Sequence, residues 1–241
     1  MAKKKRTRTA RKSKKREPLT AERVVAAAIA IADAQGTAAL TMRAVAEALG
    51  VRAMSLYNHV ANKDAILDRM VDAVFARIVV PTNTDWRTAM RARARTIYEE
   101  LKAHPWAIGL LESRRAPGAT TLLHHDATIG VLRGAGFSST MVAHSLALLD
   151  AYVYGFAIQE LSLPLEPSED VPALAREVLA SIPADAVPNL GWLATEQVLN
   201  ASYSFSDEFE YGLELVLEGI ERRAQPGGDP SCETEARRGT K

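Results

Sequence analysis

The sequence predicts an all-α protein, with a three-helix helix-turn-helix head at the N-terminal end and a larger helical body behind it. Helix-starting residues, apolar residues three or four positions apart, and a glycine or proline stop recur along the chain. No segment alternates between apolar and polar residues as a half-buried strand would. With 241 residues, 47% of them hydrophobic, the chain can bury a core of ordinary size.

The N-terminal end is strongly basic. Residues 1–16, MAKKKRTRTARKSKKR, contain ten Lys or Arg and no acidic residue. The other 225 residues carry 20 basic and 29 acidic side chains, a net charge of −9. We expect a disordered basic arm over residues 1–18 whose partner is an anionic polymer such as nucleic acid. A solvated tail and a nuclear-import signal are the alternative interpretations of this run.

Residues that cap and end helices begin directly after the arm. Thr20 is placed to cap the helix AERVVAAAIAIADAQ, and Gly36 is placed to end it. Thr41 opens the helix MRAVAEAL in the same way, and Gly50 ends it. These signals predict the first two helices of the head.

A longer helix connects the head to the body. Asn62 caps it, an apolar stripe runs along KDAILDRMVDAVFARIV, and Pro81 follows its end. We expect this helix to extend from residue 63 to residue 78.

The rest of the chain is also helical in pattern. We expect helices in DWRTAMRARARTIYEELKA, WAIGLLES, GATTLLHHDATIGVLRGAG, SSTMVAHSLALLDAYVYGFAIQE and DEFEYGLELVLEGIERRA. Pro117 suits the first turn of the third of these helices. The fourth is apolar nearly all round except for Asp150, which is typical of a helix buried on several sides. The proline-spaced segment 162–206 has room for one more helix around ALAREVLASI, and residues 226–241 are predicted to be a disordered tail.

The segment TMRAVAEALGVRAMSLYNHV fits two helices joined by a tight turn at Gly50. If the second helix starts near Ala53, Leu56 and Val60 share its inner face. We expect Met54, Ser55 and Asn58 to point outward, with Tyr57 and His59 on the flanks. A helix-turn-helix presents such a second helix to the major groove of DNA, whereas an ordinary helical hairpin with a solvated face is the alternative.

The outward groups have chemistry that suits DNA. Asn58 can pair with adenine, Arg43 or Arg52 with guanine, and Ser55 with either, while Met54 can contact a thymine methyl. Tyr57, His59 and Lys63 are suited to phosphate oxygens, and the free N–H groups behind Thr41 add an anion site.

This segment and its surroundings resemble the TetR family of bacterial transcriptional repressors. The resemblance covers Leu19 to Met70 almost without gaps, and LTMRAVAEALGV followed by SLYNHVANKDAILD is highly specific to that family. A second, weaker resemblance is FEYGLELVLEGIERR, which is similar to the last helix of the tetracycline repressors. The resemblance implies a homodimer with two DNA-binding heads over residues 19–65 and a ligand-binding and dimerisation body over residues 66–225.

The resemblance also assigns the DNA contacts. The family's DNA-contacting positions fall on Arg43, Ala53, Ser55, Tyr57, Asn58, His59 and Lys63. The founding member of the family has Gln and Pro in place of Ala53 and Met54, and Trp in place of Asn58. We therefore expect an operator sequence that differs from that of the tetracycline repressor.

In the body, the resemblance implies a ligand site between helices and a dimer interface made by the helix at 138–160 and the last helix. A pocket of this kind is lined by apolar and aromatic groups with a few polar ones. The candidates are Trp106, Leu110, Leu111, His124, Tyr152, Tyr154 and Gln159, with His144 and Trp192 behind them. Core packing or a surface position is the alternative for each of them. Gly212 and Gly219 are candidates for a close approach of two last helices across the dimer axis.

We expect no metal or other cofactor. Adjacent histidines on a helix point about 100° apart, so at most one of His124 and His125 can face a site. The tetracycline repressors hold a magnesium–drug complex with a histidine and an acidic residue, and Leu111 and Gln159 occupy the matching positions here. Magnesium prefers oxygen ligands, so magnesium–tetracycline is not the expected effector. We expect a small-molecule inducer that is largely apolar or aromatic.

Composition and motifs also argue against several other classes of protein. No apolar run reaches the roughly 18 residues of a membrane span, and no apolar segment follows the basic N-terminus to make a secretory signal. The single Cys232 cannot form an internal disulfide, so we expect a cytoplasmic protein in a reducing compartment. The family resemblance implies that the protein is bacterial and nucleoid-associated. There is no Gly-rich phosphate loop or nucleophile elbow, and we expect no enzyme activity. The rival functions are an architectural or RNA-binding protein that works through its arm, and an activator or constitutive repressor of the same fold.

Taken together, we expect a transcriptional repressor that binds a pseudo-palindromic operator as a homodimer. The resemblance implies that a ligand in the body shifts the connecting helix and changes the spacing of the two heads.

Overall fold

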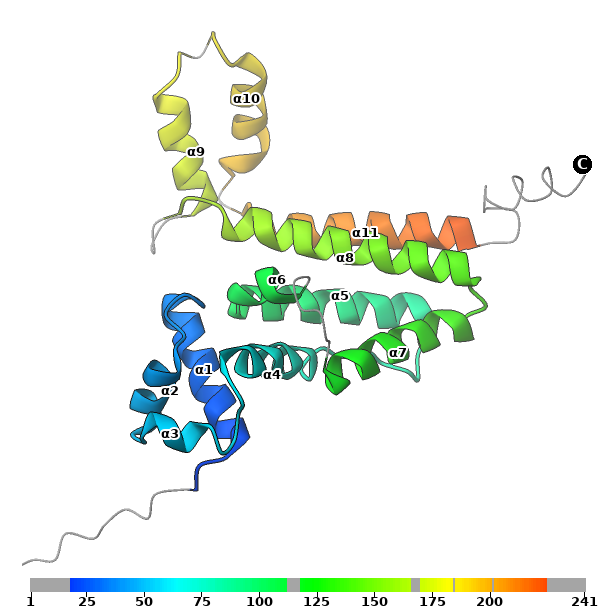
Figure 1. Ribbon diagram of the computed structural model, residues 1–241. Coiled ribbons are helices and arrows are strands. Elements are labelled where there is room, and N and C mark those ends of the chain that lie inside the picture. Colours follow the sequence, from blue (N-terminus) through cyan, green and yellow to red (C-terminus); the bar gives the residue numbers. More distant parts are fainter. Residues whose placement is uncertain (1–17, 112–117, 166–169, 184, 201, 225–241) are drawn as a thin grey trace, which may run out of the picture.

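The computed structural model describes residues 18–111, 118–165, 170–183, 185–200 and 202–224, and every regular element in these ranges is a helix. The predicted arm apart from Pro18, the whole of the predicted tail and Pro117 lie outside them. Figure 1 shows a small head, formed by α1 to α3, beside a larger body to which α4 leads.

The head begins with α1 (Ala21–Gln35) and α2 (Met42–Leu49). The Oγ1 atoms of Thr20 and Thr41 accept hydrogen bonds from the N–H groups of the third residues of their helices, as the sequence predicts. Gly36 and Gly50 end the two helices at φ values of 75° and 64°, a region that a residue with a Cβ rarely adopts. The positive φ at Gly50 lets the chain turn at once into α3 (Ala53–Leu56).

The connecting helix α4 (Lys63–Phe75) is shorter than predicted and ends before residue 78. Asn62 caps its start as expected, through a 2.8 Å hydrogen bond from the N–H group of Ala65. Ile78 lies beyond the end of α4 and is still buried, so the apolar pattern in the sequence is longer than the helix. An apolar pattern records burial, and a turn that keeps the side chain in the core satisfies it equally well.

Two apolar cores meet along α4. Its first half, including Ile66 and Met70, packs with the head, whereas Val74 and Phe75 pack with the body. The body core also takes side chains from α5 (Trp86–Ala103), α6 (Trp106–Leu111), α7 (Ala119–Gly134), α8 (Ser139–Leu161) and α11 (Phe205–Ala224).

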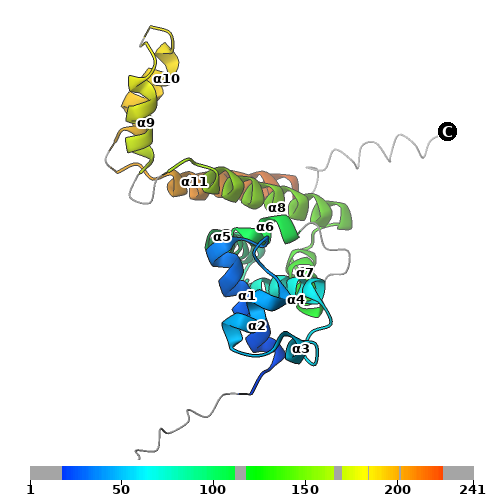
Figure 2. The ribbon, with the colours of Figure 1, turned by 60° about the vertical axis from the view of Figure 1, so that its left-hand side comes forward.

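The long helices α8 and α11 lie side by side in both views (Figures 1 and 2). By length and composition α8 is apolar enough to cross a membrane, with a mean hydropathy of 1.4 over its best window. Its inner face packs into the body core, where Leu149 and Val153 are fully buried. Along the opposite face, Ala143, Ala147, Ala151 and Gly155 are exposed at intervals of four residues. A helix that is apolar on both faces needs a second partner.

The segment between α8 and α11 holds more structure than the one helix that was predicted. It forms α9 (Val171–Ala180), α10 (Pro188–Leu193) and the π-helical turn η1 (Ala194–Val198). Figure 2 shows α9 and α10 projecting beyond the end of the α8–α11 pair. Their facing apolar side chains surround a cleft of about 220 Å³.

The prediction for Gly212 requires a correction. A Cβ atom at Gly212 would lie 2.3 Å from the hydroxyl oxygen of Tyr152 in the same chain. The close approach that needs this glycine is therefore between α8 and α11 of one protomer. A Cβ atom at Gly219 would meet nothing within 4 Å, so that position is open to a second chain.

Candidate functional site

Helix α3 and the turn that follows it present the predicted recognition face. Leu56 and Val60 are 0% and 4% exposed and anchor α3 to the head core, as predicted. The helix ends at Leu56, and hydrogen bonds from the N–H groups of His59 and Val60 to the Leu56 carbonyl continue the fold as a turn.

The predicted DNA-contacting side chains divide by exposure. Met54 is 76% exposed and Tyr57 48% exposed. The exposed set is Thr41, Arg43, Arg52, Met54, Tyr57 and Asn58, and the partly buried set is Ala53, Ser55, His59 and Lys63. The sequence placed Ser55 outward and Tyr57 on the flank, and the exposures are the other way round. Tyr57 lies beyond the end of the helix at Leu56, where a 100° step per residue ceases to apply. The helix end does not explain the partial burial of Ser55, which lies within α3.

Lys63 has a partner inside the head. Its Nζ donates a 3.2 Å hydrogen bond to the carbonyl oxygen of Thr37, which ties the start of α4 to the α1–α2 connection. An ammonium group has three donors, so this bond leaves donors for a phosphate. The assignment of Lys63 to the DNA backbone stays a prediction.

The centre of the body holds a buried polar cluster that the sequence analysis missed. Arg93 of α5 is 1% exposed. Its Nη1 donates to Asp150 of α8 at 2.7 Å, and its Nε donates to the Nε2 of His124 of α7 at 3.1 Å. The other terminal nitrogen, Nη2, is buried and has no hydrogen-bond partner among the described residues.

The environment of this cluster keeps His124 neutral. Burial, and then the positive charge of Arg93, lower the pKa of His124 from 6.5 to about 3. A neutral ring can accept the Arg93 hydrogen bond at Nε2 and carries its own proton on Nδ1. One signal in the sequence pointed to this cluster, namely the single acidic residue Asp150 in an otherwise apolar helix. A partly buried carboxylate favours a cationic partner, and in the structure Arg93 is that partner.

The predicted ligand candidates lie on α6, at the polar cluster, on α8 and on α10. Trp106, Leu110 and Leu111 lie on α6, where Trp106 and Leu110 pack against both the head core and the body core. His124 lies at the polar cluster and packs against the ring of Phe75.

The third group of candidates is on α8. Tyr152 faces α11, where its hydroxyl donates to the carbonyl oxygen of Phe209 at 2.8 Å, and burial raises its pKa to about 12. Tyr154 is half-buried, and Gln159 is exposed, as is His144. Trp192, on α10, is 66% exposed. The ligand-binding roles of all these residues stay predictions.

Two family models match the chain. Residues 24–70 match the model described as bacterial regulatory proteins of the tetR family, and residues 80–224 match the tetracyclin repressor-like C-terminal domain. The first match covers the head and most of α4, and the second covers the body described above.

Individual proteins of similar sequence or structure support the same family as the two family models. The HTH-type transcriptional repressor DrrR1 of Streptomyces coeruleorubidus is 32% identical over 217 residues, covering 84% of this chain and 77% of that protein. The class A tetracycline repressor from transposon 1721 of Escherichia coli is 26% identical, with coverages of 83% and 89%. The crystal structure of the Streptomyces coelicolor TetR family protein ActR in complex with actinorhodin has a TM-score of 0.70 and 30% identity, with coverages of 86% and 97%. The head, the body and these matches together show that the chain belongs to the TetR family of DNA-binding transcriptional regulators.

Proposed function

We propose that this protein represses transcription in the bacterial cytoplasm, as a homodimer bound to a pseudo-palindromic operator on nucleoid DNA, and that a small molecule bound in the body releases it. The observation that carries the proposal is the exposed face around α3. Met54, Tyr57 and Asn58 stand in solvent there while Leu56 and Val60 hold the segment in the core. An exposed amide beside an exposed Tyr and a flexible apolar side chain suits base edges and phosphates.

The test is selection of binding sites from random duplex DNA. Wild type should enrich a short pseudo-palindrome, because two identical heads read two half-sites. Asn58→Ala and Arg43→Ala should relax the preference at defined positions of each half-site. Leu123→Ala, on the exposed surface of α7, is the matched control and should leave the preference unchanged. Enrichment without any shared sequence would instead favour an architectural protein.

Exposed apolar side chains on α8 and on α11 support the proposed homodimer. The small-residue stripe of α8 is flanked by Leu148, which is 48% exposed. On α11, Tyr211 and Leu215 are 68% and 49% exposed. Pairing of α8 and α11 with the same two helices of a second copy would bury these faces in a four-helix arrangement around a two-fold axis.

The buried cluster supports a metal-free effector with an oxygen acceptor. The unpaired Nη2 of Arg93 can donate to a carbonyl, phenolate or carboxylate oxygen, and a charged donor in a dry site makes a strong hydrogen bond. Leu111 and Gln159 occupy the positions at which chelating repressors have ligands for a magnesium–drug complex. ActR, the structural relative described above, was crystallised with actinorhodin. We therefore propose an aromatic effector that carries such an oxygen.

A panel of hydroxyanthraquinones, with tetracycline plus Mg²⁺ alongside, tests this proposal. Binding measured by calorimetry should be unaffected by EDTA and should release the operator. Arg93→Met should weaken binding of the best ligand, whereas Arg95→Met, two residues along α5 on the exposed surface, should not. Binding that required Mg²⁺ would contradict the metal-free proposal.

A further inference from the structure

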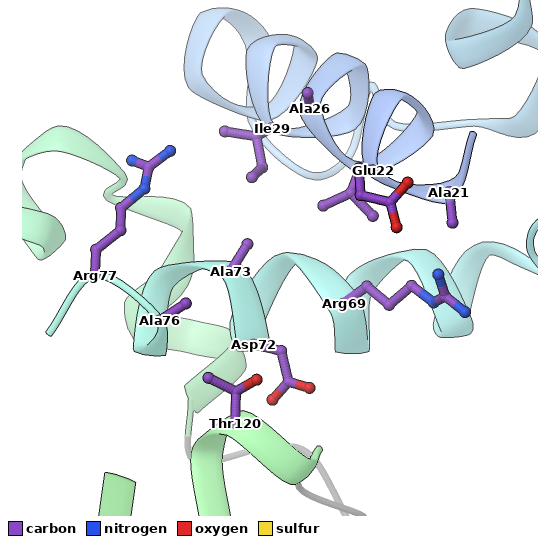
Figure 3. A pocket seen from close by; sticks show the side chains of 11 residues that line it. Ala21, Glu22, Ala26, Ile29, Arg69, Asp72, Ala73, Ala76, Arg77 and Thr120 are labelled. Atoms are coloured by element: carbon purple, nitrogen blue, oxygen red, sulfur yellow. The ribbon is translucent and has the colours of Figure 1, made fainter. Parts of the chain in front are cut away.

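Beside α4, the head and the body are incompletely packed. A cleft of about 530 Å³ lies between α1 and α4 and reaches the start of α7. Figure 3 shows Arg69 and Arg77 at opposite ends of this cleft, with the small side chains of Ala73 and Ala76 between them. Side chains this small give α4 little contact with α1 on that side. The orientation of the head therefore depends on the packing of the first half of α4 into the head core and on contacts outside this cleft.

One such contact joins α1 directly to the body. A single carboxylate oxygen, Oδ1 of Asp33 on α1, lies 2.7 Å from the Nδ1 of His104 and 2.6 Å from the Nε1 of Trp106. His104 ends α5 and Trp106 begins α6, so both donors stand at one corner of the body. We call Asp33, His104 and Trp106 the head–body latch.

A second contact fixes the direction of the latch. The Nη1 of Arg77 lies 2.8 Å from the Nε2 of His104. Because a guanidinium can only donate, Nε2 must accept, and the ring proton is on Nδ1, where it faces Asp33. Glu100 lies 3.4 Å from the same Arg77 nitrogen and holds it in place.

The corner that carries the two donors is well fixed. The N–H group of His104 bonds to the carbonyl of Glu100, and the carbonyl of His104 accepts from the N–H group of Ala107, both at 2.8 Å. The side chain of His104 is 9% exposed, and that of Asp33 is 33% exposed. The ring of Trp106 packs against both apolar cores. The latch therefore joins α1 to the end of α5 through His104 and to the start of α6 through Trp106.

We propose that the head–body latch holds the heads in the orientation that binds the operator, so that breaking it weakens operator binding. This inference rests on the proposed function and adds a regulatory contact to it. In Figures 1 and 2, α3 lies at the end of the head away from α8 and α11, whereas the end of α1 that carries Asp33 lies beside α5 and α6. The latch thus acts on the recognition face only by orienting it.

Operator affinity of Asp33 variants is the first measurement. Asp33→Ala removes the shared acceptor and should weaken operator binding about tenfold, which corresponds to about 1.4 kcal/mol. Asp33→Asn keeps an oxygen at the same place and should retain most of the affinity. Loss of an acidic side chain alone would strengthen DNA binding, because it removes repulsion from phosphates. Asp126→Ala, on the exposed surface of α7, measures that electrostatic effect.

The donor side offers a matched pair. Asn at position 104 places an N–H donor near the position of Nδ1, so His104→Asn should keep the bond to Asp33. Gln reaches the position of Nε2 instead, so His104→Gln should lose the bond to Asp33, keep the bond from Trp106 and weaken operator binding, though less than Asp33→Ala does. Equal affinities for the two variants would show that the imidazole matters only through packing and would overturn the latch.

Amide hydrogen exchange tests the latch without DNA. In Asp33→Ala, exchange should become faster at residues 103–111 and at the end of α1, but not in Asp126→Ala. Unchanged exchange would overturn the latch whatever the DNA result. Faster exchange with unchanged operator affinity would overturn its role in orienting the heads. If wild type selected no operator at all, the proposed function would fail, and the exchange data alone would decide whether the latch joins head and body.

Discussion

At the scale of single residues, the body is organised around a buried guanidinium whose partners come from two other helices. Asp150 neutralises Arg93, and His124 accepts a second hydrogen bond from it. Removing one member of a buried charged pair costs more than the pair contributes, because the other charge is left without compensation. The cluster therefore fixes the mutual positions of α5, α7 and α8. It also leaves one donor, Nη2, for another group.

His124 gives this cluster a pH dependence. Its folded-state pKa of about 3 is below the ordinary value of 6.5, so the unfolded chain binds a proton that the folded chain does not between these values. Its contribution to the free energy of unfolding is therefore fully present above pH 6.5 and is lost as the pH falls towards 3. The slope is at most about 1.4 kcal/mol per pH unit.

His124→Gln should flatten this dependence, because Gln can accept from Arg93 and does not titrate. Urea unfolding of both proteins between pH 6.5 and about 4, at fixed protein concentration, measures the difference. Carboxylates contribute equally to both curves and cancel. Parallel curves for wild type and variant would mean that His124 has the same pKa in the folded and the unfolded chain.

The candidate DNA site could be predicted closely from the sequence, and the body site could not. Leu56 and Val60 were identified as anchors because helical spacing is local information. Arg93 was not identified, because its position in MRARARTI follows the same spacing as Arg91 and Arg95, which pair with acids of α11 near the surface. Only the tertiary contact with Asp150 distinguishes a buried arginine from its exposed neighbours.

At the scale of helices, capping residues were the strongest signals. Thr20, Thr41 and Asn62 cap their helices as predicted, since a side-chain oxygen beside the first free N–H groups acts locally. The two elements at 188–198 were missed. Helix α10 has only six residues and no side-chain cap, so it offers neither a capping signal nor a full apolar period. The turn η1 has the wider π-helical geometry, which does not follow the 3.6-residue period.

A row of charges joins α5 to α11. The Nη2 atoms of Arg87 and Arg91 lie 2.9 Å and 2.8 Å from the same oxygen of Glu214. These hydrogen bonds, from Arg91 above all, lower the pKa of Glu214 from 4.5 to about 2. A depressed carboxylate pKa stabilises the fold above the unfolded value and loses that effect as the pH falls from 4.5 towards 2.

Glu214→Gln should lower the free energy of unfolding at neutral pH by about 1 kcal/mol, since partial exposure screens the pair. The loss should shrink in high salt and below pH 4.5. Glu218→Gln is the matched control, because Glu218 lies 3.7 Å from Arg87 and is 50% exposed. Equal losses for the two variants would contradict a special role for Glu214.

The outer face of α8 has its own test. Ala151→Glu places a charge in the middle of the small-residue stripe, and burying a charge without a partner at an interface costs several kcal/mol. We expect light scattering to find a monomer that no longer binds a two-half-site operator. Leu123→Glu, on exposed α7, should remain a dimer. A dimeric Ala151→Glu protein would place the interface elsewhere.

At the scale of the whole molecule, the body reaches the head by two routes. One is α4, where the Oδ1 of Asp72 accepts hydrogen bonds from the hydroxyl and the N–H group of Thr121 at the start of α7. The other is the head–body latch at the corner of α5 and α6. Because the two routes begin on different body helices, an effector that shifts α6 against α7 would rotate the head as well as displace it. By linkage, operator binding must then weaken effector binding by the same factor.

The charge distribution of the chain gives the last prediction. Ten of its 30 basic side chains lie in residues 1–16, while the remainder is net negative. Phosphate neutralisation releases counterions, and the slope of log affinity against log salt grows by about 0.9 for each phosphate contacted. Deleting residues 2–16 should therefore weaken binding to the operator and to unrelated DNA by the same factor and should reduce the salt slope in both cases. Titrations of both duplexes at several salt concentrations measure this, with Lys→Gln and Arg→Gln changes throughout the arm as the length-matched control. A deletion that altered which operator is selected would instead assign base-reading contacts to the arm.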